Sequence, residues 1–234
     1  MVAPAILAVT TITAAMTLKS DIKPVQAYVK TPKGTLYWGG AGLNGFYINP
    51  TLNALRRAGI SNVSVGLTNT ATQDMGGHGM IVDAIRAGLA IRYEDNGDWL
   101  IKSGMSATGG DFNMIGYSYG SLLAAQTANF YAKQGVKINN LVLIASPIDA
   151  SFLDKLKSNK NIEKLLILDL TNRGDEIHAG MQQLELLNPY FLKKLGDDMA
   201  AGKGQGHFYC GHPVPDLPQR LEILANWLVK QGLK

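Results

Sequence analysis

Serine, histidine and aspartate residues occur in this sequence in an order that could support nucleophilic catalysis. Ser118 lies at the centre of a Gly-x-Ser-x-Gly pattern over residues 116–120, Asp175 lies just beyond a glycine turn, and His207 follows a glycine-rich break. A serine hydroxyl is a poor nucleophile at neutral pH, so it needs a base, usually a histidine that a carboxylate orients. The three residues together could attack a carbonyl carbon and transfer its acyl group to water.

The segments on either side of Ser118 predict a sharp turn from a strand into a helix. Residues 112–115 form an apolar run typical of a buried strand, and residues 121–128 form an alanine-rich run typical of a helix. Glycines on both sides of the serine relieve crowding at such a turn, and the amide of Tyr119 at the helix start can point at an oxyanion. The Gly-x-Ser-x-Gly pattern arises easily by chance in a chain with 26 glycines among 234 residues. The assignment of Ser118 as nucleophile therefore depends on the strand predicted before it and the helix predicted after it.

Four histidines are candidates for the base. His207 and His212 both lie between the last strand signal and the last predicted helix, and His207 is favoured because it follows the glycine-rich residues 202–206. His212 stays open as the alternative. His78 precedes the serine and His178 lies inside a predicted helix, so both fit ordinary surface histidines. No His-Glu-x-x-His pairing occurs, so no metal site is expected.

The carboxylate is expected in a loop that follows a predicted strand. Asp175 follows the apolar run 165–170 and is the first choice, with a helix cap before Ile177 as its competing interpretation. Asp169, within that run, and Asp149, after the earlier run 141–145, are the open substitutes.

The elements that must position these residues alternate between strand and helix patterns. This alternation predicts an α/β protein with a mainly parallel sheet and helices on both faces. The Asn96-Gly97 pair adds a small hairpin insertion near 91–102. The predicted strands are 34–38, 60–67, 112–115, 141–145 and 165–170, and the predicted helices are 51–58, 81–91, the one after Ser118, 151–157, 177–187, 189–201 and 218–231.

Composition predicts one folded domain over 34–234, preceded by an apolar segment and lead-in over 1–33. Residues 2–18 carry no charge and no basic residue precedes them, which favours a docking segment or core helix and leaves a membrane anchor or atypical signal open. This N-terminal segment does not indicate a cellular compartment. The net charge of +4 comes without a basic run interleaved with aromatics, which argues against nucleic-acid binding. Cys210 is the single cysteine, expected to be a buried thiol.

The order Ser118, Asp175, His207 and the strand-to-helix placement of the serine resemble the α/β-hydrolase superfamily, particularly its lipases and esterases. The resemblance covers the chain from about Gly34 onward. It implies a Ser-His-Asp triad at the carboxyl ends of the strands and hydrolysis of carboxylic esters through an acyl-enzyme, without a cofactor. In that family a loop after an early strand completes the oxyanion hole. The glycine-rich residues 39–42 match that loop, so the amide of Ala41 or Gly40 would join that of Tyr119.

The resemblance also bears on substrate and partners. An acyl ester or lipid is the expected substrate, with contact to a membrane surface as a further expectation. The chain is similar to the compact lipase effectors that bacteria deliver into competitors, which implies an inhibitory partner protein. A thioesterase, amidase or peptidase on the same scaffold, and a non-enzymatic binding protein, are the alternatives. The apolar residues expected to suit an acyl chain are Leu43, Phe46, Tyr117, Tyr119 and Phe208.

Overall fold

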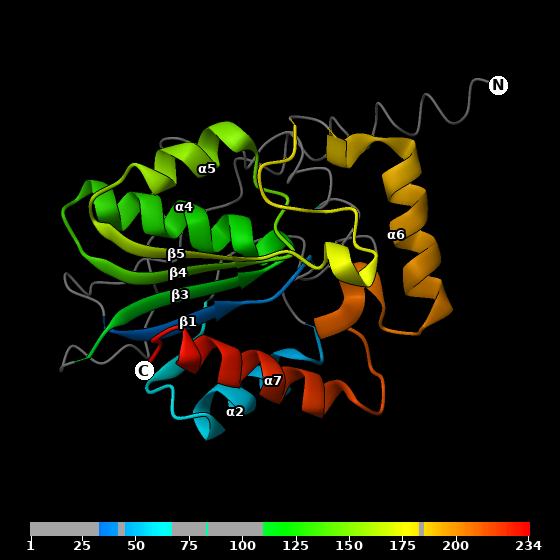
Figure 1. Cartoon of the computed structure of the whole chain (residues 1–234), viewed down its shortest axis with the longest axis horizontal. Coiled ribbons are helices and arrows are strands. Elements are labelled where there is room, and N and C mark those ends of the chain that lie inside the picture. The colour runs from blue at the N-terminus through cyan, green and yellow to red at the C-terminus, as the bar shows by residue number, and fades with distance from the viewer. Residues whose placement is uncertain (1–32, 42–44, 67–82, 84–109, 183–184) are drawn as a thin grey trace.

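A single parallel sheet lies at the centre of the molecule (Figure 1). The computed structural model describes residues 33–41, 45–66, 83, 110–182 and 185–234. Within these residues the sheet has five strands in the order β2-β1-β3-β4-β5, and each neighbouring pair runs parallel. The strands are β1 (Gly34–Trp38), β2 (Val63–Val65), β3 (Phe112–Tyr117), β4 (Ile138–Ile144) and β5 (Ile162–Leu168).

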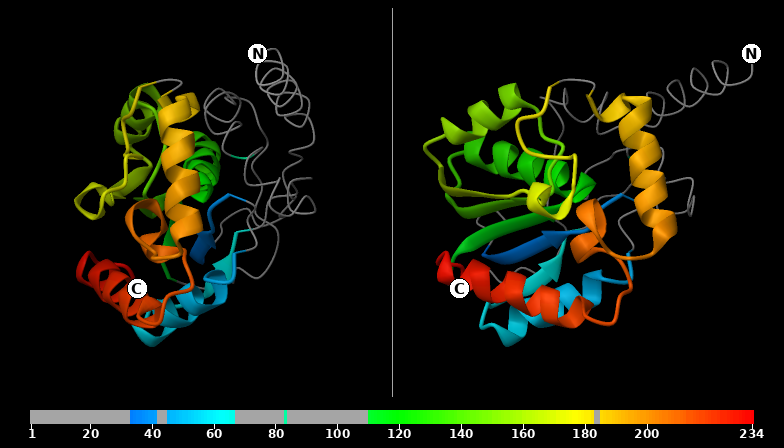
Figure 2. Two further views of the ribbon diagram at one scale, coloured as in Figure 1. Left: turned by 90° about the vertical axis from the view of Figure 1, so that its right-hand side faces the viewer. Right: turned by 45° about the vertical axis from the view of Figure 1, so that its right-hand side comes forward.

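Helices cover both faces of this sheet, which confirms the α/β architecture predicted from the sequence. Helices α4 (Tyr119–Lys133) and α5 (Ala150–Lys157) lie on one face, and α2 (Ile48–Arg57) and α7 (Leu217–Lys230) lie on the other (Figure 1). Helix α6 (Pro189–Ala201) stands beyond the carboxyl ends of the strands, as the rotated views of Figure 2 also show.

The two faces of the sheet bury two separate groups of apolar side chains. Along β3, Phe112 and Met114 contact the core on the α4 side, whereas Ile115 and Tyr117 belong to the core on the α2 and α7 side. Alternate side chains of a strand point to opposite faces, and both faces are covered here, so the strands have continuous apolar runs. Each large apolar side chain that is fully buried contributes roughly 1.5–3 kcal/mol.

A row of buried polar side chains crosses the sheet on the α7 side. The Asn113 amide donates to the Thr35 hydroxyl (3.1 Å), and the Asn140 amide donates to the Asn113 carbonyl oxygen (2.7 Å). These residues are register partners on β1, β3 and β4. The next partner along the row, Lys164, donates to the main-chain carbonyl of Gln231 at the end of α7. A slip of one residue would unpair buried polar groups, so this row favours the observed register.

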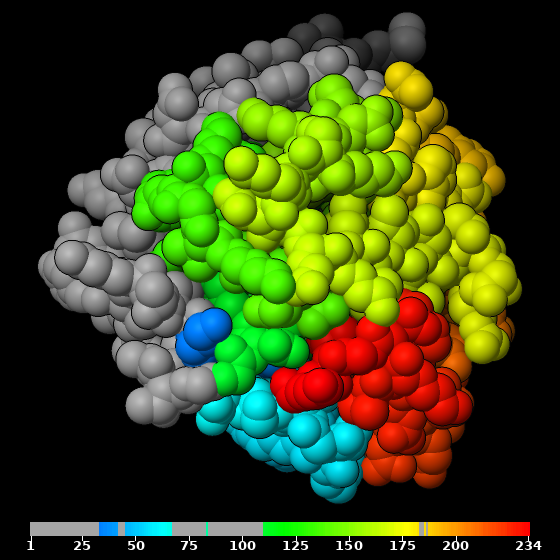
Figure 3. All heavy atoms as spheres, turned by 60° about the vertical axis from the view of Figure 1, so that its left-hand side comes forward, coloured from blue at the N-terminus to red at the C-terminus, as the bar shows by residue number. Residues whose placement is uncertain are grey.

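Helices α2 and α7 lie side by side on the outer surface, as the space-filling view shows (Figure 3). Arg57 of α2 and Glu222 of α7 form an ion pair at 3.2 Å with both side chains more than half exposed. Exposed pairs of this kind contribute little to stability. The buried leucines of the two helices therefore hold this layer on the sheet.

The predicted helix over 177–187 is wrong. Residues 175–178 form no regular element, Met181 forms an isolated bridge with Asp149, and a short 3-10 helix, η5, follows at Glu185–Leu187. The amide of Gly180 donates to the carbonyl of Ile148 at 2.8 Å. Long-range bonds of this kind replace the bonds of a helix in this segment, and the apolar spacing that predicted a helix cannot reveal them.

The strand predicted over 60–67 is shorter, because Ile60 belongs to the turn that ends α2. Its amide donates to the carbonyl of Leu55 at 3.0 Å, and β2 begins only at Val63. The N-terminal segment 1–33 apart from its last residue, the hairpin near 91–102, and all but one residue of the helix predicted over 81–91 lie outside the described residues. In the part of the chain that is described, no helix has both the length and the apolar character needed to cross a bilayer.

Candidate active site

Ser118 forms the tight turn between β3 and α4 and has an unusual backbone conformation. Its φ is 55° and its ψ is −126°, a region that residues with a β-carbon rarely adopt. Its amide donates to the carbonyl of Ile144 on the neighbouring strand at 2.8 Å. Backbone strain of this kind persists only where surrounding contacts impose it, and it concentrates at functional sites. The turn holds the Ser118 side chain at the carboxyl edge of the sheet.

Glycine is required on both sides of this turn because the backbone is close to other chain segments. A β-carbon on Gly120 would overlap the carbonyl oxygen of Gly39 and lie 2.6 Å from that of Trp38. A β-carbon on Gly116 would overlap the start of α4 and lie 2.6 Å from the Ser121 nitrogen. The crowding that the sequence pattern predicts is therefore present at both glycines, and at Gly120 it involves the end of β1.

The structure brings Ser118, His207 and Asp175 together in one hydrogen-bonded chain. The Ser118 Oγ lies 2.6 Å from His207 Nε2, and His207 Nδ1 lies 2.9 Å from Asp175 Oδ2. The histidine and aspartate side chains are only 7% and 1% exposed. His207 lies on the 3-10 helix η6 (Gly206–Cys210), and Asp175 follows the 3-10 helix η4 (Thr171–Arg173). A base within hydrogen-bond reach of the hydroxyl, with a carboxylate on its other nitrogen, can activate the serine.

Asp175 binds a different partner with each carboxylate oxygen. Oδ2 faces His207, while Oδ1 accepts a hydrogen bond from the Ile177 amide at 2.9 Å. The second bond is the one that a helix cap would make, but no helix begins at Ile177. The alternative carboxylates have other partners, since Asp149 caps α5 by accepting from the Phe152 amide and Asp169 accepts from the Ala179 amide.

The other histidines lie elsewhere. His212 stacks edge-to-face on Phe208 with ring centres 6.4 Å apart, and its ring borders Gly202. His178 is exposed, with a ring nitrogen 3.3 Å from the carbonyl of Ala179. His78 lies outside the described residues. Between β5 and His207 the described residues contain helices and turns but no strand, so His207 is positioned by a 3-10 helix.

The loop after β1 lies beside Ser118. A β-carbon on Gly40 would be 3.3 Å from that of Ser118. The Gly40 amide donates to the Tyr47 hydroxyl at 2.6 Å, and burial raises the pKa of Tyr47 to about 12, which keeps this phenol neutral. Because the Gly40 amide is engaged in this bond, the geometry favours Ala41 over Gly40 as an oxyanion donor. Tyr119, the other predicted donor, is the first residue of α4.

Tyr117 makes two contacts with His207 that the sequence does not reveal. Its hydroxyl donates to the main-chain carbonyl of His207, and its ring stacks on the imidazole with ring centres 5.7 Å apart and an interplanar angle of 22°. Burial raises the pKa of Tyr117 well above its usual value, so the phenol stays a donor. The partners are separated by 90 positions, which no local pattern can connect.

Two of the aromatic residues expected to suit an acyl chain are part of the core instead. Tyr117 and Tyr119 are 3% and 2% exposed, because one packs under His207 and the other packs within the core on the α4 side. Phe46 is exposed, and Phe208 lies half-buried with its ring perpendicular to that of His207. Leu43 lies outside the described residues.

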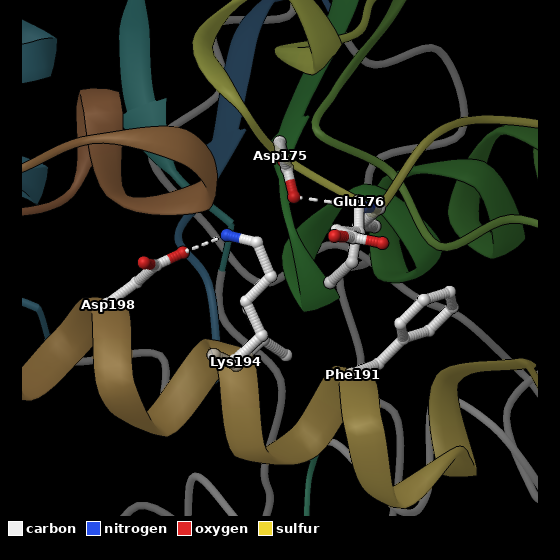
Figure 4. Close-up of a pocket in the computed structure, with 7 residues that line it drawn as sticks. Asp175, Glu176, Phe191, Lys194 and Asp198 are labelled. Atoms are coloured by element: carbon white, nitrogen blue, oxygen red, sulfur yellow. Dashed lines mark hydrogen bonds and ion pairs between the residues drawn. The ribbon is translucent and has the colours of Figure 1, made fainter.

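A hollow lies between α6 and the loop that carries Asp175 (Figure 4). Lys194 and Asp198 project from α6 toward the Asp175 loop and form an ion pair at 2.8 Å. The hydrogen bond to Asp198 raises the pKa of Lys194. The hollow borders the carboxylate of the triad, not the serine. Its lining residues are Asp175, Glu176, Ile177, Phe191, Lys194, Leu195 and Asp198.

Among the described residues no group of three or more histidine, cysteine, aspartate or glutamate side chains is arranged to hold a metal ion. Comparison of the chain with protein-family models, with curated proteins and with solved structures finds no match. The functional argument therefore depends on the geometry of the site.

Proposed function

We propose that this protein is a serine hydrolase of the α/β-hydrolase type that cleaves carboxylic esters. The observation that carries the proposal is the hydrogen-bonded chain from Ser118 through His207 to Asp175, with both links between 2.6 and 2.9 Å. The strained backbone of Ser118 at a strand-to-helix turn supports it, because that turn is typical of the nucleophile of such enzymes.

The mechanism follows from the order of these contacts. His207 Nε2 takes the proton of the Ser118 hydroxyl as its Oγ attacks the ester carbonyl carbon, and Asp175 stabilises the imidazolium. The main-chain amides of Tyr119 and Ala41 stabilise the oxyanion. The tetrahedral intermediate collapses, the alcohol leaves with the proton from His207, and Ser118 holds the acyl group as an ester. His207 then takes a proton from water, whose oxygen attacks the acyl-enzyme, and returns that proton to the Ser118 Oγ as the acid is released.

The proposed substrates are acyl esters, including lipid esters at a membrane surface. An inhibitory partner protein is part of the proposal, by resemblance to bacterial lipase effectors. A panel of short esters, long esters, phospholipids, thioesters and amides tests the substrate class on purified protein. Faster turnover of thioesters or amides than of esters would replace the ester assignment.

A fluorophosphonate probe tests the nucleophile directly. The phosphorus reacts with an activated serine and loses fluoride, which leaves a covalent adduct that mass spectrometry can assign to one residue. We expect the adduct on Ser118, loss of labelling in Ser118→Ala, and a fall in ester turnover of at least about a thousandfold. Ser158→Ala, at the exposed end of α5, is the matched control and should label normally. Folded wild-type protein without any adduct would favour a binding protein over an enzyme.

A further inference from the structure

The ring of Tyr209 contacts two arginine side chains that come from different elements. The guanidinium carbon of Arg173 lies 4.5 Å from the ring centre, and that of Arg220 lies 4.4 Å from it. Both distances suit attraction between a cation and the face of an aromatic ring. We call this arrangement the Arg173–Tyr209–Arg220 stack.

The stack joins the two loops that carry the acid and the base of the triad. Tyr209 is on η6, two positions after His207, and Arg173 ends η4, two positions before Asp175. The triad itself spans the same gap with one hydrogen bond, from His207 Nδ1 to Asp175 Oδ2. The stack is therefore a second connection between the same two loops.

Arg220, on α7, anchors the segment that carries His207. Its Nε forms an ion pair with Asp216 at 2.9 Å, and its side chain is only 13% exposed. A terminal nitrogen donates to the carbonyl of Tyr209 at 3.2 Å and also to that of Gly204. These two carbonyls lie on either side of His207 in the chain, so Arg220 holds both ends of the segment that carries the base.

We propose that Tyr209 is a positioning residue that couples the Asp175 loop to the His207 loop. This inference rests on the proposed hydrolase function. A 3-10 helix as short as η6 holds itself weakly, and a misplacement of about 1 Å in a catalytic group can cost about a hundredfold in rate. The aromatic ring also attracts both guanidinium groups. Without the ring, the repulsion between Arg173 and Arg220 would no longer be offset by this attraction, and it would favour moving the two loops apart.

Tyr209→Leu tests the coupling, because it removes the ring and keeps an apolar side chain. We expect kcat for ester hydrolysis to fall about 10- to 100-fold with KM within about twofold. Tyr209→Phe keeps the ring and should restore kcat to within about twofold of wild type. The matched control is Tyr190→Leu, a tyrosine on α6 with an exposed side chain, which should leave both parameters unchanged. Arg173→Gln, at an exposed position, removes the acid-side cation without altering the core and should also lower kcat.

A second readout does not depend on turnover. In protein labelled with ¹⁵N-histidine, the Nδ1 proton of His207 should be protected from solvent exchange in wild type and in Tyr209→Phe, and exposed to it in Tyr209→Leu. Wild type without turnover or labelling would overturn the proposed function, and the exchange measurement would still test the coupling. Active wild type with unchanged kcat and exchange in Tyr209→Leu would overturn the coupling alone. Equal loss in Tyr209→Phe and Tyr209→Leu would overturn it too, since it would assign the effect to the hydroxyl.

Discussion

His207 is held from three directions, and each contact fixes a different property of the imidazole. The carboxylate at Nδ1 favours the tautomer with its proton there, which leaves Nε2 as an acceptor for the Ser118 hydroxyl. Tyr117 stacks on the ring and binds the carbonyl of the same residue. Asp175 thus favours one tautomer, while the ring and the hydroxyl of Tyr117 hold the ring plane and the backbone.

Asp175→Asn tests whether the carboxylate sets this tautomer. The new amide can keep its oxygen toward the Ile177 amide and then presents an N–H group to His207 Nδ1. The ring would have to accept at Nδ1 and carry its proton on Nε2, which could no longer accept from Ser118. We expect kcat to fall about 10³- to 10⁴-fold with little change in the melting temperature. Asp149→Asn, which can keep its cap on α5, is the control, and an Asp175→Asn enzyme as active as this control would contradict the role of Asp175.

At the scale of the elements, the sequence predicts what local contacts determine and fails where long-range bonds dominate. The strands through the core and the helix after Ser118 follow from apolar runs and turn residues, and so does the glycine-flanked turn. The helix predicted over 177–187 does not form, since the amide of Ala179 bonds to the side chain of Asp169 and that of Gly180 bonds to Ile148. The glycine-rich break before His207 favours it over His212 as the candidate base. The sequence does not predict the 3-10 helix that positions His207.

The turn from β3 into α4 should tolerate no side chain at Gly120. A β-carbon there would overlap the carbonyl of Gly39 and crowd that of Trp38, which are backbone atoms that cannot rotate away. We expect Gly120→Ala to lower the free energy of unfolding by about 1–3 kcal/mol and to lower ester turnover, because the loop after β1 must move. Gly196→Ala is the matched control on α6, where a β-carbon meets nothing within 4 Å. It should raise stability by about 0.5–1 kcal/mol. Urea unfolding measures both, and equal stabilities of the two variants would refute the crowding.

At the scale of the whole molecule, the strand order explains why the site lies where it does. The chain goes from β1 outward to β2 and then returns to place β3 on the other side of β1. The segment after β1 leads to α2 on one face, and the segment after β3 leads to α4 on the other (Figure 1). In parallel α/β sheets a crevice forms where neighbouring strands send their connections to opposite faces. Ser118 and Gly40 meet at that point.

The core on the α2 and α7 side of the sheet holds weak acids that are buried in their neutral forms. Burial raises the pKa of Cys210 from 9.0 to about 12 and that of Tyr47 from 10.0 to about 12. The folded state therefore binds protons that the unfolded chain has already released above those ordinary values. The stability linked to these groups is complete below about pH 9 and is lost as the pH rises toward 12.

Cys210→Ala removes one of these titrating groups and so tests its contribution to the pH dependence of stability. Between pH 9 and 12 the free energy of unfolding of wild type should fall more steeply than that of the variant, by about 1.4 kcal/mol per pH unit for one proton. The variant loses some stability at neutral pH through the cavity that it leaves, so the slopes are the quantity to compare. Met199→Ala, at an exposed position on α6, changes no titrating group and should keep the wild-type slope. Urea unfolding at a series of pH values measures all three proteins. Parallel curves for wild type and Cys210→Ala would mean that the thiol ionises as readily in the folded protein as in the unfolded chain, contrary to its burial beneath the site.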